Sequence, residues 1–331
     1  MPEELWPLLP VLLLILAAEF VNGWTDAPNA IATVVSTRVL SPYQAVVMAS
    51  VLNILGAMSG TAVAATIAKG IVDPAIINTV TIGAAMVAII CWSTVAWYYG
   101  LPTSESHALV AGLAGAGLAL AGPSVLLWEG WRKVIIGIIF STFLGFLGGM
   151  AIMLIIYWLF RRSRPGTVRG IFGRLQVLSA ALMAFSHGSN DGQKFIGVFT
   201  LALVLGGVIP EFRISYWVIV LCGVVMGVGT TCGGWRIIRT MGLRLTKLEP
   251  VHGFAAESSA ALVIEAATRL GIPLSTTHTI NTAIMGVGSH RRFSAVRWGV
   301  AGEIVTAWIL TFPVCGIIAY LIARFISYFS H

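Results

Sequence analysis

Ten apolar segments, most of them long enough to cross a lipid bilayer, follow one another along this chain. A membrane-spanning helix needs about 20 predominantly apolar residues. Only 10% of the 331 residues are charged and 57% are hydrophobic, whereas soluble domains carry about 25% charged residues. The sequence therefore predicts an all-α polytopic membrane protein. The apolar segments cover 5–37, 43–68, 79–100, 104–121, 133–160, 174–205, 214–235, 250–270, 274–289 and 296–325.

Two polar stretches interrupt these segments at membrane depth. The first reads Asn-Gly-Trp-Thr-Asp-Ala-Pro-Asn and contains Asp26; the second reads His-Gly-Ser-Asn-Asp-Gly-Gln-Lys and contains Asp191. Polar and ionisable groups inside a membrane are costly and usually functional. Glycine and proline favour a break in a helix, which a membrane protein tolerates where the break lines a cavity. We therefore expect broken helices near 22–28 and 187–193.

Both halves of the chain carry the same two motifs in the same order. The first motif is the polar stretch around Asp26, which recurs around Asp191. The second reads Gly-Leu-Pro-Thr-Ser-Glu-Ser-His up to His107 and Gly-Ile-Pro-Leu-Ser-Thr-Thr-His up to His278. The step along the chain from the first copy to the second is nearly the same for both motifs. Two motif pairs at nearly equal offsets indicate an internal duplication.

The second motif stands between two apolar segments with almost no polar spacer. Its glycine and proline end one helix, and Ser104 or Ser275 can cap the next one. Two arrangements remain open: a surface turn between full crossings, or the tip of a re-entrant hairpin. We expect hairpins over 79–121 and 250–289, because re-entrance brings both serines to the depth of the two aspartates.

The basic residues predict how the chain is inserted. Whether the tips are turns or re-entrant, each half crosses the membrane an odd number of times, so the second half is inverted. With the N-terminus outside, thirteen basic residues lie on the cytoplasmic side and five outside, as the positive-inside rule requires. The net charge of +7 is then a topological signal, and no nucleic acid is expected as a partner. The cytoplasmic basic residues are Arg38, Arg161, Arg162, Arg164, Arg169, Arg174, Arg236, Arg239, Arg244, Lys247, Arg291, Arg292 and Arg297.

The expected fold is two inverted-topology repeats in the cell membrane, each with a broken helix and a re-entrant helical hairpin. Repeat 1 covers 1–160, repeat 2 covers 174–331, and a cytoplasmic basic linker, 161–173, joins them. Inverted repeats whose broken helices meet near the bilayer midplane are typical of secondary transporters.

The hairpin tips and the polar stretches together form a candidate anion site. Helix N-termini present free N–H groups and a positive dipole end, which bind phosphate above all, and hydroxyls add donors. Carboxylates alone would repel an anion, so Asp26 and Asp191 imply that a proton or cation arrives with it. The candidate substrate-binding residues are Asp26, Asn29, Thr103, Ser104, Asn190, Asp191, Lys194, Ser275, Thr276 and Thr277. The candidate coupling-ion residues are Asp26, Asn29, Asp191 and Glu257.

Lys194 follows Asp191 by three residues, so in a helix both face one site. An unpaired ammonium in a membrane interior is costly, which makes Asp191 or the anion its expected partner. The alternative is that Lys194 snorkels towards the interface. Elsewhere at membrane depth, Glu265 can pair with Arg269 at i+4. His107 and His278 lie one turn after the tip serines, and a structural role and a functional role are equally expected for them.

These motifs resemble those of the inorganic phosphate transporter (PiT) family over nearly the whole chain. The most specific are Ser-His-Gly-Ser-Asn-Asp-Gly-Gln-Lys and Pro-Leu-Ser-Thr-Thr-His in the second half. The resemblance implies symport of inorganic phosphate with Na⁺ or H⁺, an inverted repeat and a homodimer.

Several positions differ from the pattern of sodium-coupled members of that family. Such members resemble Asn-Asp-x-x-Asn in both halves and carry Glu in place of Asn53, whereas this chain has Thr25 before its first Asp and Lys194 in the second half. The Gln-Lys pair resembles the bacterial branch, which implies coupling to protons and transport of phosphate complexed with a divalent metal. The sequence does not identify a resident metal site, and no prosthetic group is expected.

Three alternative functions are weighed against a phosphate symporter. A sulfate permease would share the fold, but phosphate carries protons at neutral pH and can donate to a carboxylate, which sulfate cannot. An intramembrane hydrolase would use Ser104 or Ser275 with a histidine and an aspartate, yet duplication supplies two symmetric half-sites and not one nucleophile. An anion channel suits a closed site with paired carboxylates poorly. We therefore expect a transporter and not an enzyme.

Overall fold

The computed structural model describes residues 5–290 and 292–329, and within these ranges the chain is almost entirely helical. By length and composition, six of the described helices can cross a membrane, or eight spans if each of two bent helix pairs counts as one. The helices are α1 (Leu5–Ser36), α2 (Pro42–Ala57), α3 (Ala62–Gly70), α4 (Thr79–Tyr99), α5 (Glu105–Ala121), α6 (Trp128–Ile139), α7 (Gly145–Phe160), α8 (Pro165–Leu205), α9 (Tyr216–Thr230), α10 (Trp235–Arg239), α11 (Pro250–Arg269), α12 (Thr276–Ser289) and α13 (Trp298–Phe329). Short 3₁₀ segments are η1 (Gly122–Val125) and η4 (Phe293–Ala295), and π segments are η2 (Phe140–Leu144) and η3 (Thr240–Arg244).

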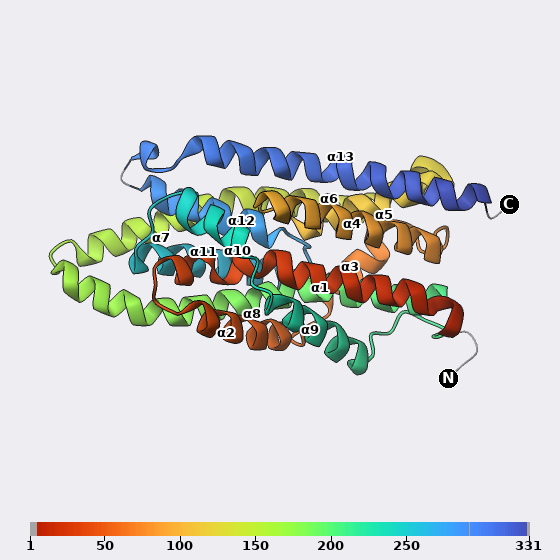
Figure 1. Cartoon of the computed structure of the whole chain (residues 1–331), viewed down its shortest axis with the longest axis horizontal. Coiled ribbons are helices and arrows are strands. Elements are labelled where there is room, and N and C mark those ends of the chain that lie inside the picture. The colour runs from red at the N-terminus through yellow and green to blue at the C-terminus, as the bar shows by residue number, and fades with distance from the viewer. Residues whose placement is uncertain (1–4, 291, 330–331) are drawn as a thin grey trace.

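The long helices lie side by side along the long axis of the molecule (Figure 1). Helices α1 and α8, which carry the two duplicated aspartates, run in opposite directions in Figure 1, as inverted repeats require. The polytopic all-α prediction is confirmed. The predicted linker 161–173 differs from the structure, because α8 begins at Pro165 and takes in most of it.

The expected helix breaks near 22–28 and 187–193 are wrong in position. α1 and α8 are continuous through both stretches. A break does occur in each half, but between α2 and α3, bent by 69°, and between α9 and α10, bent by 60°. Pro28 lies inside α1, and neighbouring helices make such a proline tolerable in a membrane helix.

The glycines of the two polar stretches allow close helix packing and do not break a helix. A Cβ atom on Gly23 would lie 2.1 Å from the carbonyl oxygen of Met226 on α9, and one on Gly188 would lie 2.2 Å from that of Asn53 on α2. Small residues at helix interfaces in membranes permit this approach of backbones. The two contacts are counterparts, since α1 packs on α9 as α8 packs on α2.

We expect Gly23→Ala to destabilise the protein, because its new methyl group would force α1 and α9 apart. Overpacking of this kind costs about 1–3 kcal/mol. Thermal unfolding in detergent measures the effect. Gly83→Ala on α4 is the matched control, since its Cβ would have ordinary contacts at 3.8 Å and beyond. Equal unfolding temperatures for the two variants would contradict the packing role of Gly23.

Two helical hairpins enter the molecule from opposite ends. Hairpin α4–α5 lies in the half that carries both termini, and hairpin α11–α12 lies in the other half (Figure 1). The 14 residues of α12 rise only about 21 Å, at 1.5 Å per residue, which is less than the roughly 30 Å of a bilayer core. The length of α12 therefore supports re-entrance of hairpin α11–α12 over a surface turn between full crossings. In hairpin α4–α5, Thr79–Tyr99 and Glu105–Val125 are each long and apolar enough to span, so re-entrance of that hairpin stays a prediction.

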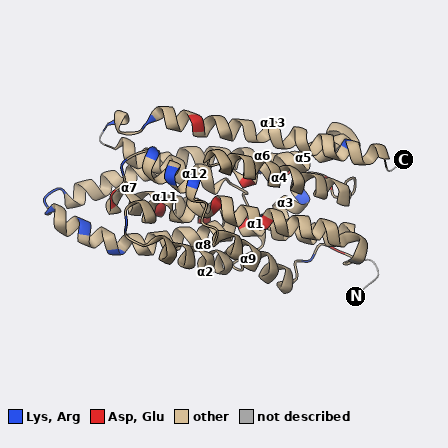
Figure 2. Cartoon of the chain, viewed as in Figure 1, with Lys and Arg blue, Asp and Glu red and all other residues tan. Residues whose placement is uncertain are grey.

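Lysine and arginine residues gather towards the end of the molecule that carries the turn between α7 and α8 (Figure 2). This end lies opposite the N- and C-termini, as the charge count predicted. Arg291 lies outside the described residues. Arg269 pairs with Glu265 at 2.9 Å as expected, and its side chain is 78% exposed, so the pair lies at the surface of the protein.

The charge distribution predicts that Arg164 faces the cytoplasm. A cysteine at this position should stay unlabelled when an impermeant maleimide is added to intact cells, and should react once the membrane is opened. Glu129→Cys, at the other end of the molecule and 77% exposed at its side chain, is the matched external control. Both variants need the exposed Cys91 and Cys232 replaced by serine. Labelling of position 164 in intact cells would show that Arg164 faces outward and that the predicted orientation is wrong.

Candidate functional site

The two aspartates lie against the tip of the second hairpin. The Thr277 hydroxyl donates to Asp26 Oδ1 at 3.3 Å, and the Thr276 hydroxyl donates to Asp191 Oδ2 at 2.7 Å. Asn29 on α1 donates to both hydroxyl oxygens, at 3.2 Å to Thr276 and 2.9 Å to Thr277. One hairpin tip therefore bridges the aspartates of both halves.

Lys194 contacts both hairpin tips from α8. Its ammonium pairs with the Asp191 carboxylate and donates to the Ser106 hydroxyl and, at 3.0 Å, to the Leu274 carbonyl oxygen. The side chain is 1% exposed, so the snorkelling alternative is wrong and the predicted Asp191 partner is confirmed. A buried ion pair is tolerated when further hydrogen bonds satisfy its remaining donors, and the two tips provide them.

The contacts of Asn29 and Lys194 are counterparts in the two repeats. Asn29 and Lys194 occupy the same place in the two copies of the polar stretch, and their partners Thr277 and Ser106 occupy the same place in the two tip motifs. Each side chain reaches from the long helix of its own half to the hairpin tip of the other half. The duplicated frame thus holds a neutral amide on one side and an ammonium on the other.

The tip serines cap the second helix of each hairpin, as predicted. Ser104 Oγ accepts from the His107 backbone N–H at 3.3 Å, and Ser275 Oγ accepts from the His278 backbone N–H at 3.1 Å. A capping hydroxyl keeps its own proton as a donor. The tips also touch, since the Ser106 hydroxyl donates to the Leu274 carbonyl oxygen at 2.9 Å. Two helix N-termini therefore converge on one place, where positive dipole ends favour an anion.

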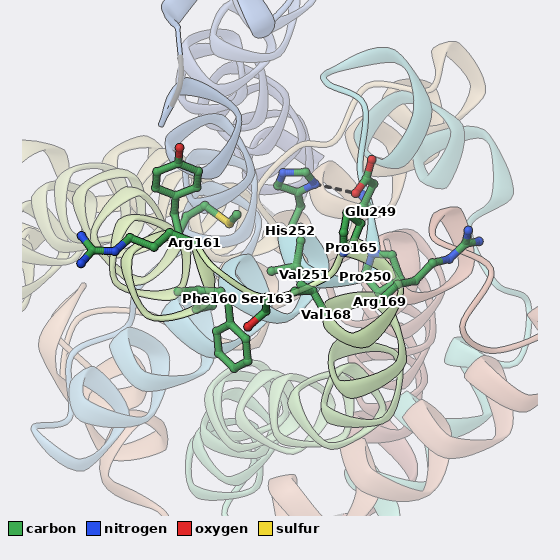
Figure 3. A pocket seen from close by; sticks show the side chains of 13 residues that line it. Phe160, Arg161, Ser163, Pro165, Val168, Arg169, Glu249, Pro250, Val251 and His252 are labelled. Atoms are coloured by element: carbon green, nitrogen blue, oxygen red, sulfur yellow. Dashed lines mark hydrogen bonds between the residues drawn. The ribbon is translucent and has the colours of Figure 1, made fainter.

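All eleven predicted site residues are at most 4% exposed, so the site is closed to solvent from both ends. Thr103 is buried with them beside Ser104. The cavity of about 270 Å³ between the α7–α8 turn and the start of α11 is a different place (Figure 3). Residues such as Arg161, Arg169 and Glu249 line it, and none of the eleven does.

Two predicted residues lie away from the convergence of the tips. Glu257 accepts from Thr33 at 2.5 Å, from Gln176 at 3.0 Å and from Ser179, which places it in a second buried polar cluster. Asn190 donates to Thr268 on α11 at 2.8 Å. Sequence reasoning alone grouped them with the site because it had no side-chain directions.

Sequence reasoning did not assign His187 and Glu105 to the site. His187 Nε2 lies 3.2 Å from Asp191 Oδ2, and Glu105 accepts from Thr25 at 2.9 Å. Ligand atoms of Asp26, His187 and Asp191 all lie within 4.8 Å of one another. The signal was present, because His187 and Asp191 share a helix face at i, i+4. The expected break at this point concealed it.

The tip histidines pack behind the site. The His107 and His278 rings lie 4.6 Å apart in an edge-to-face arrangement, and His278 stacks on Trp308 of α13 at 3.7 Å. Edge-to-face and stacked rings contribute packing energy. These contacts favour the structural role of the two histidines over the functional role.

A protein-family model described as the phosphate transporter family matches residues 22–319. The chain belongs to the phosphate transporter family. This membership confirms the resemblance drawn from the motifs, and it is a family of transporters and not of enzymes. The hydrolase alternative is therefore wrong, in keeping with Ser104 and Ser275 serving as helix caps.

Several relatives match this phosphate transporter family member over nearly its whole length. A probable low-affinity inorganic phosphate transporter of Rhizobium meliloti (strain 1021) is 46% identical over 96% of each chain. One of Bacillus subtilis (strain 168) is 41% identical over 96% of this chain and 98% of its own. A solved structure described as the sodium-dependent phosphate transporter is 24% identical and superposes with a TM-score of 0.87, covering 97% of this chain and 99% of its own. The fold is thus that of a known multi-pass membrane transporter.

Proposed function

We propose that this family member imports inorganic phosphate across the cell membrane by symport with protons. The observation that carries the proposal is the meeting of two hairpin tips beside a buried Asp191–Lys194 pair and a second carboxylate, Asp26. The bacterial relatives are described as phosphate transporters.

The phosphate would bind where the two hairpin tips converge. Backbone N–H groups at the start of α5 and α12 supply donors, and Ser104, Ser275 and Thr103 add hydroxyls. Lys194 neutralises part of the anion's charge. Phosphate that retains a proton can donate a hydrogen bond to the Asp26 carboxylate. Sulfate has no such proton, so the site favours phosphate.

The coupling ion would bind at Asp26. Among the described residues no basic side chain lies within ion-pair distance of Asp26, whereas Asp191 has Lys194. A buried carboxylate without a cation takes up a proton readily. The ammonium of Lys194 stands in the second half as a fixed positive charge, in place of one mobile cation. Asp26, His187 and Asp191 also offer ligand atoms to a divalent metal carried in with the phosphate as part of the substrate.

Uptake of radiolabelled phosphate into proteoliposomes tests this function. We expect phosphate uptake that unlabelled arsenate suppresses and that the same excess of sulfate leaves nearly intact. Uptake suppressed equally by sulfate would assign the protein as a sulfate permease. The inverted division into 1–160 and 174–331 and a homodimeric state are parts of the same proposal, and the mass of the detergent-purified protein tests the latter.

Glu257 is proposed as a further proton-binding group on the path to the cytoplasm. Three neutral donors hold it, and it is fully buried. Gln at this position keeps the shape but cannot exchange a proton. We expect Glu257→Gln to slow proton-driven uptake severely and to leave phosphate exchange without a gradient largely intact. Equal losses in both assays would indicate a structural role instead.

A further inference from the structure

Two cavities lined by basic side chains flank the hairpin tips. The first, about 420 Å³, lies between α3, the start of α6 and the α11–α12 turn, and the second, about 330 Å³, lies between the end of α4 and the α10–η3 segment. We call them the outer and inner cavity, because α3 lies in the half of the molecule that carries the termini and α10 in the opposite half (Figure 1). Lys69, Lys133 and Arg269 line the outer cavity, and Arg236, Arg239 and Arg244 line the inner one.

Each cavity is lined by an equivalent hydrogen bond between a threonine and a glycine. Thr66 on α3 donates to the Gly271 carbonyl oxygen at 2.8 Å, and Thr240 in η3 donates to the Gly100 carbonyl oxygen at 2.7 Å. The two glycines begin the duplicated tip motifs and share a left-handed backbone, with φ of 64° and 70°. A conformation at which glycine has no steric cost suits a hinge. Two halves of different sequence have therefore kept one contact.

Each threonine holds the hairpin tip of the opposite repeat. Thr66 lies in the broken span of the first half and Gly271 in the second hairpin, while Thr240 and Gly100 have the reverse arrangement. Gly271 precedes Leu274, whose carbonyl oxygen accepts from Lys194, by three residues. A tip that moved at its glycine would therefore carry the Leu274 carbonyl oxygen away from Lys194.

In each cavity one cation is bonded to this hinge region. Lys133 donates to the Thr66 hydroxyl at 3.2 Å. Arg236 donates to the Tyr98 carbonyl oxygen at the end of α4 and lies over the Trp97 ring, 5.0 Å from its centre. An oxyanion that drew either cation into its cavity would weaken the contacts that hold the tip.

The remaining cations differ in how they are paired. Arg269 and Arg244 each have a carboxylate partner, Glu265 and Glu303 respectively, and Glu129 also lines the outer cavity. Lys133 and Arg236 are thus the cations placed to connect an arriving anion to the hinge, with Lys69 and Arg239 adding positive potential.

We propose that the outer and inner cavities are phosphate-binding vestibules. We further propose that two threonines act as latches: Thr66 holds the tip of hairpin α11–α12 closed, and Thr240 holds the tip of hairpin α4–α5 closed. Phosphate in a vestibule competes for Lys133 or Arg236 and so favours release of the adjacent latch. This inference rests on the proposed function for the identity of the anion. The latch itself has a readout that needs no transport.

Thiol accessibility of the central site tests the latches. A reporter cysteine replaces Thr103, which is 4% exposed, in protein whose exposed Cys91 and Cys232 are serine. We expect Thr66→Val to raise the rate of labelling by an impermeant thiosulfonate about five- to tenfold from outside, the effect of one lost hydrogen bond, with no change from inside. Thr240→Val should do the converse in inside-out vesicles. Thr200→Val, a buried threonine bonded within its own helix, is the matched control.

The latch proposal is wrong if either threonine variant is labelled faster from both sides or from neither side. It is also wrong if the Thr200→Val control is labelled equally fast. Lys69→Gln tests the vestibule separately and should raise the KM for external phosphate several-fold. An unchanged KM would contradict phosphate binding in the outer cavity. If the wild-type protein takes up no phosphate at all, the proposed function fails, while the side-specific labelling still decides the latches.

Discussion

Asp26→Asn is expected to abolish proton-coupled phosphate uptake while the protein stays folded. Asparagine keeps the shape of the side chain and its contact with Thr277, but it cannot bind a proton or balance a cation. Because no basic side chain pairs with Asp26 in the described part of the chain, its removal leaves no buried charge behind. Uptake into proteoliposomes and thermal unfolding in detergent are the two measurements.

Asp191→Asn is the informative comparison for that variant. It would leave the Lys194 ammonium buried without its carboxylate, and breaking a buried pair in this way costs about 3–5 kcal/mol. We therefore expect Asp191→Asn to lose both uptake and stability, where Asp26→Asn loses uptake alone. Full uptake by the Asp26 variant would reduce this residue to a structural role.

Lys194→Asn is expected to remove most proton-driven uptake, or to make uptake depend on sodium. Lysine brings a fixed positive charge to the place where its counterpart, Asn29, brings a neutral amide. Asparagine at 194 would leave Asp191 without a cation in a buried site, and a sodium ion is the mobile cation able to replace it. The amide oxygen that asparagine adds is also a ligand suited to such an ion.

Uptake driven separately by a proton gradient and by a sodium gradient measures the effect of this substitution. Lys247→Asn, at an exposed position in the segment before α11, is the matched control and should behave as wild type. A Lys194→Asn protein with unaltered proton-driven uptake would show that the ammonium does not take the place of a coupling ion.

The duplicated motifs predicted much of this fold, and packing accounts for what they did not predict. The two motif pairs predicted the internal duplication, and the odd number of crossings in each half predicted its inversion. The Gly-x-Pro-x-Ser motifs predicted hairpin tips at which Ser104 and Ser275 cap the following helices. Gly23 and Gly188 were interpreted as helix breakers, because a local sequence does not show which helix will lie against a glycine. Only the approach of α9 and α2 explains why no side chain fits there.

The site was predictable in its residue types more than in its groupings. The pairing of Lys194 with Asp191 followed from helical spacing. The assignment of Glu257 to a separate cluster did not, since Thr33, Gln176 and Ser179 come from distant parts of the chain. His187 was missed because helical periodicity was not applied across an expected break.

The most direct test of proton-coupled phosphate import is a simultaneous record of phosphate and protons in sodium-free proteoliposomes. An acidic exterior provides the driving gradient, radiolabelled phosphate reports the anion, and a trapped pH indicator reports the lumen. We predict that phosphate accumulates above its external concentration and that the lumen acidifies faster when phosphate is present than when it is absent. Phosphate accumulation that requires a sodium gradient, with no acidification linked to phosphate, would contradict the account.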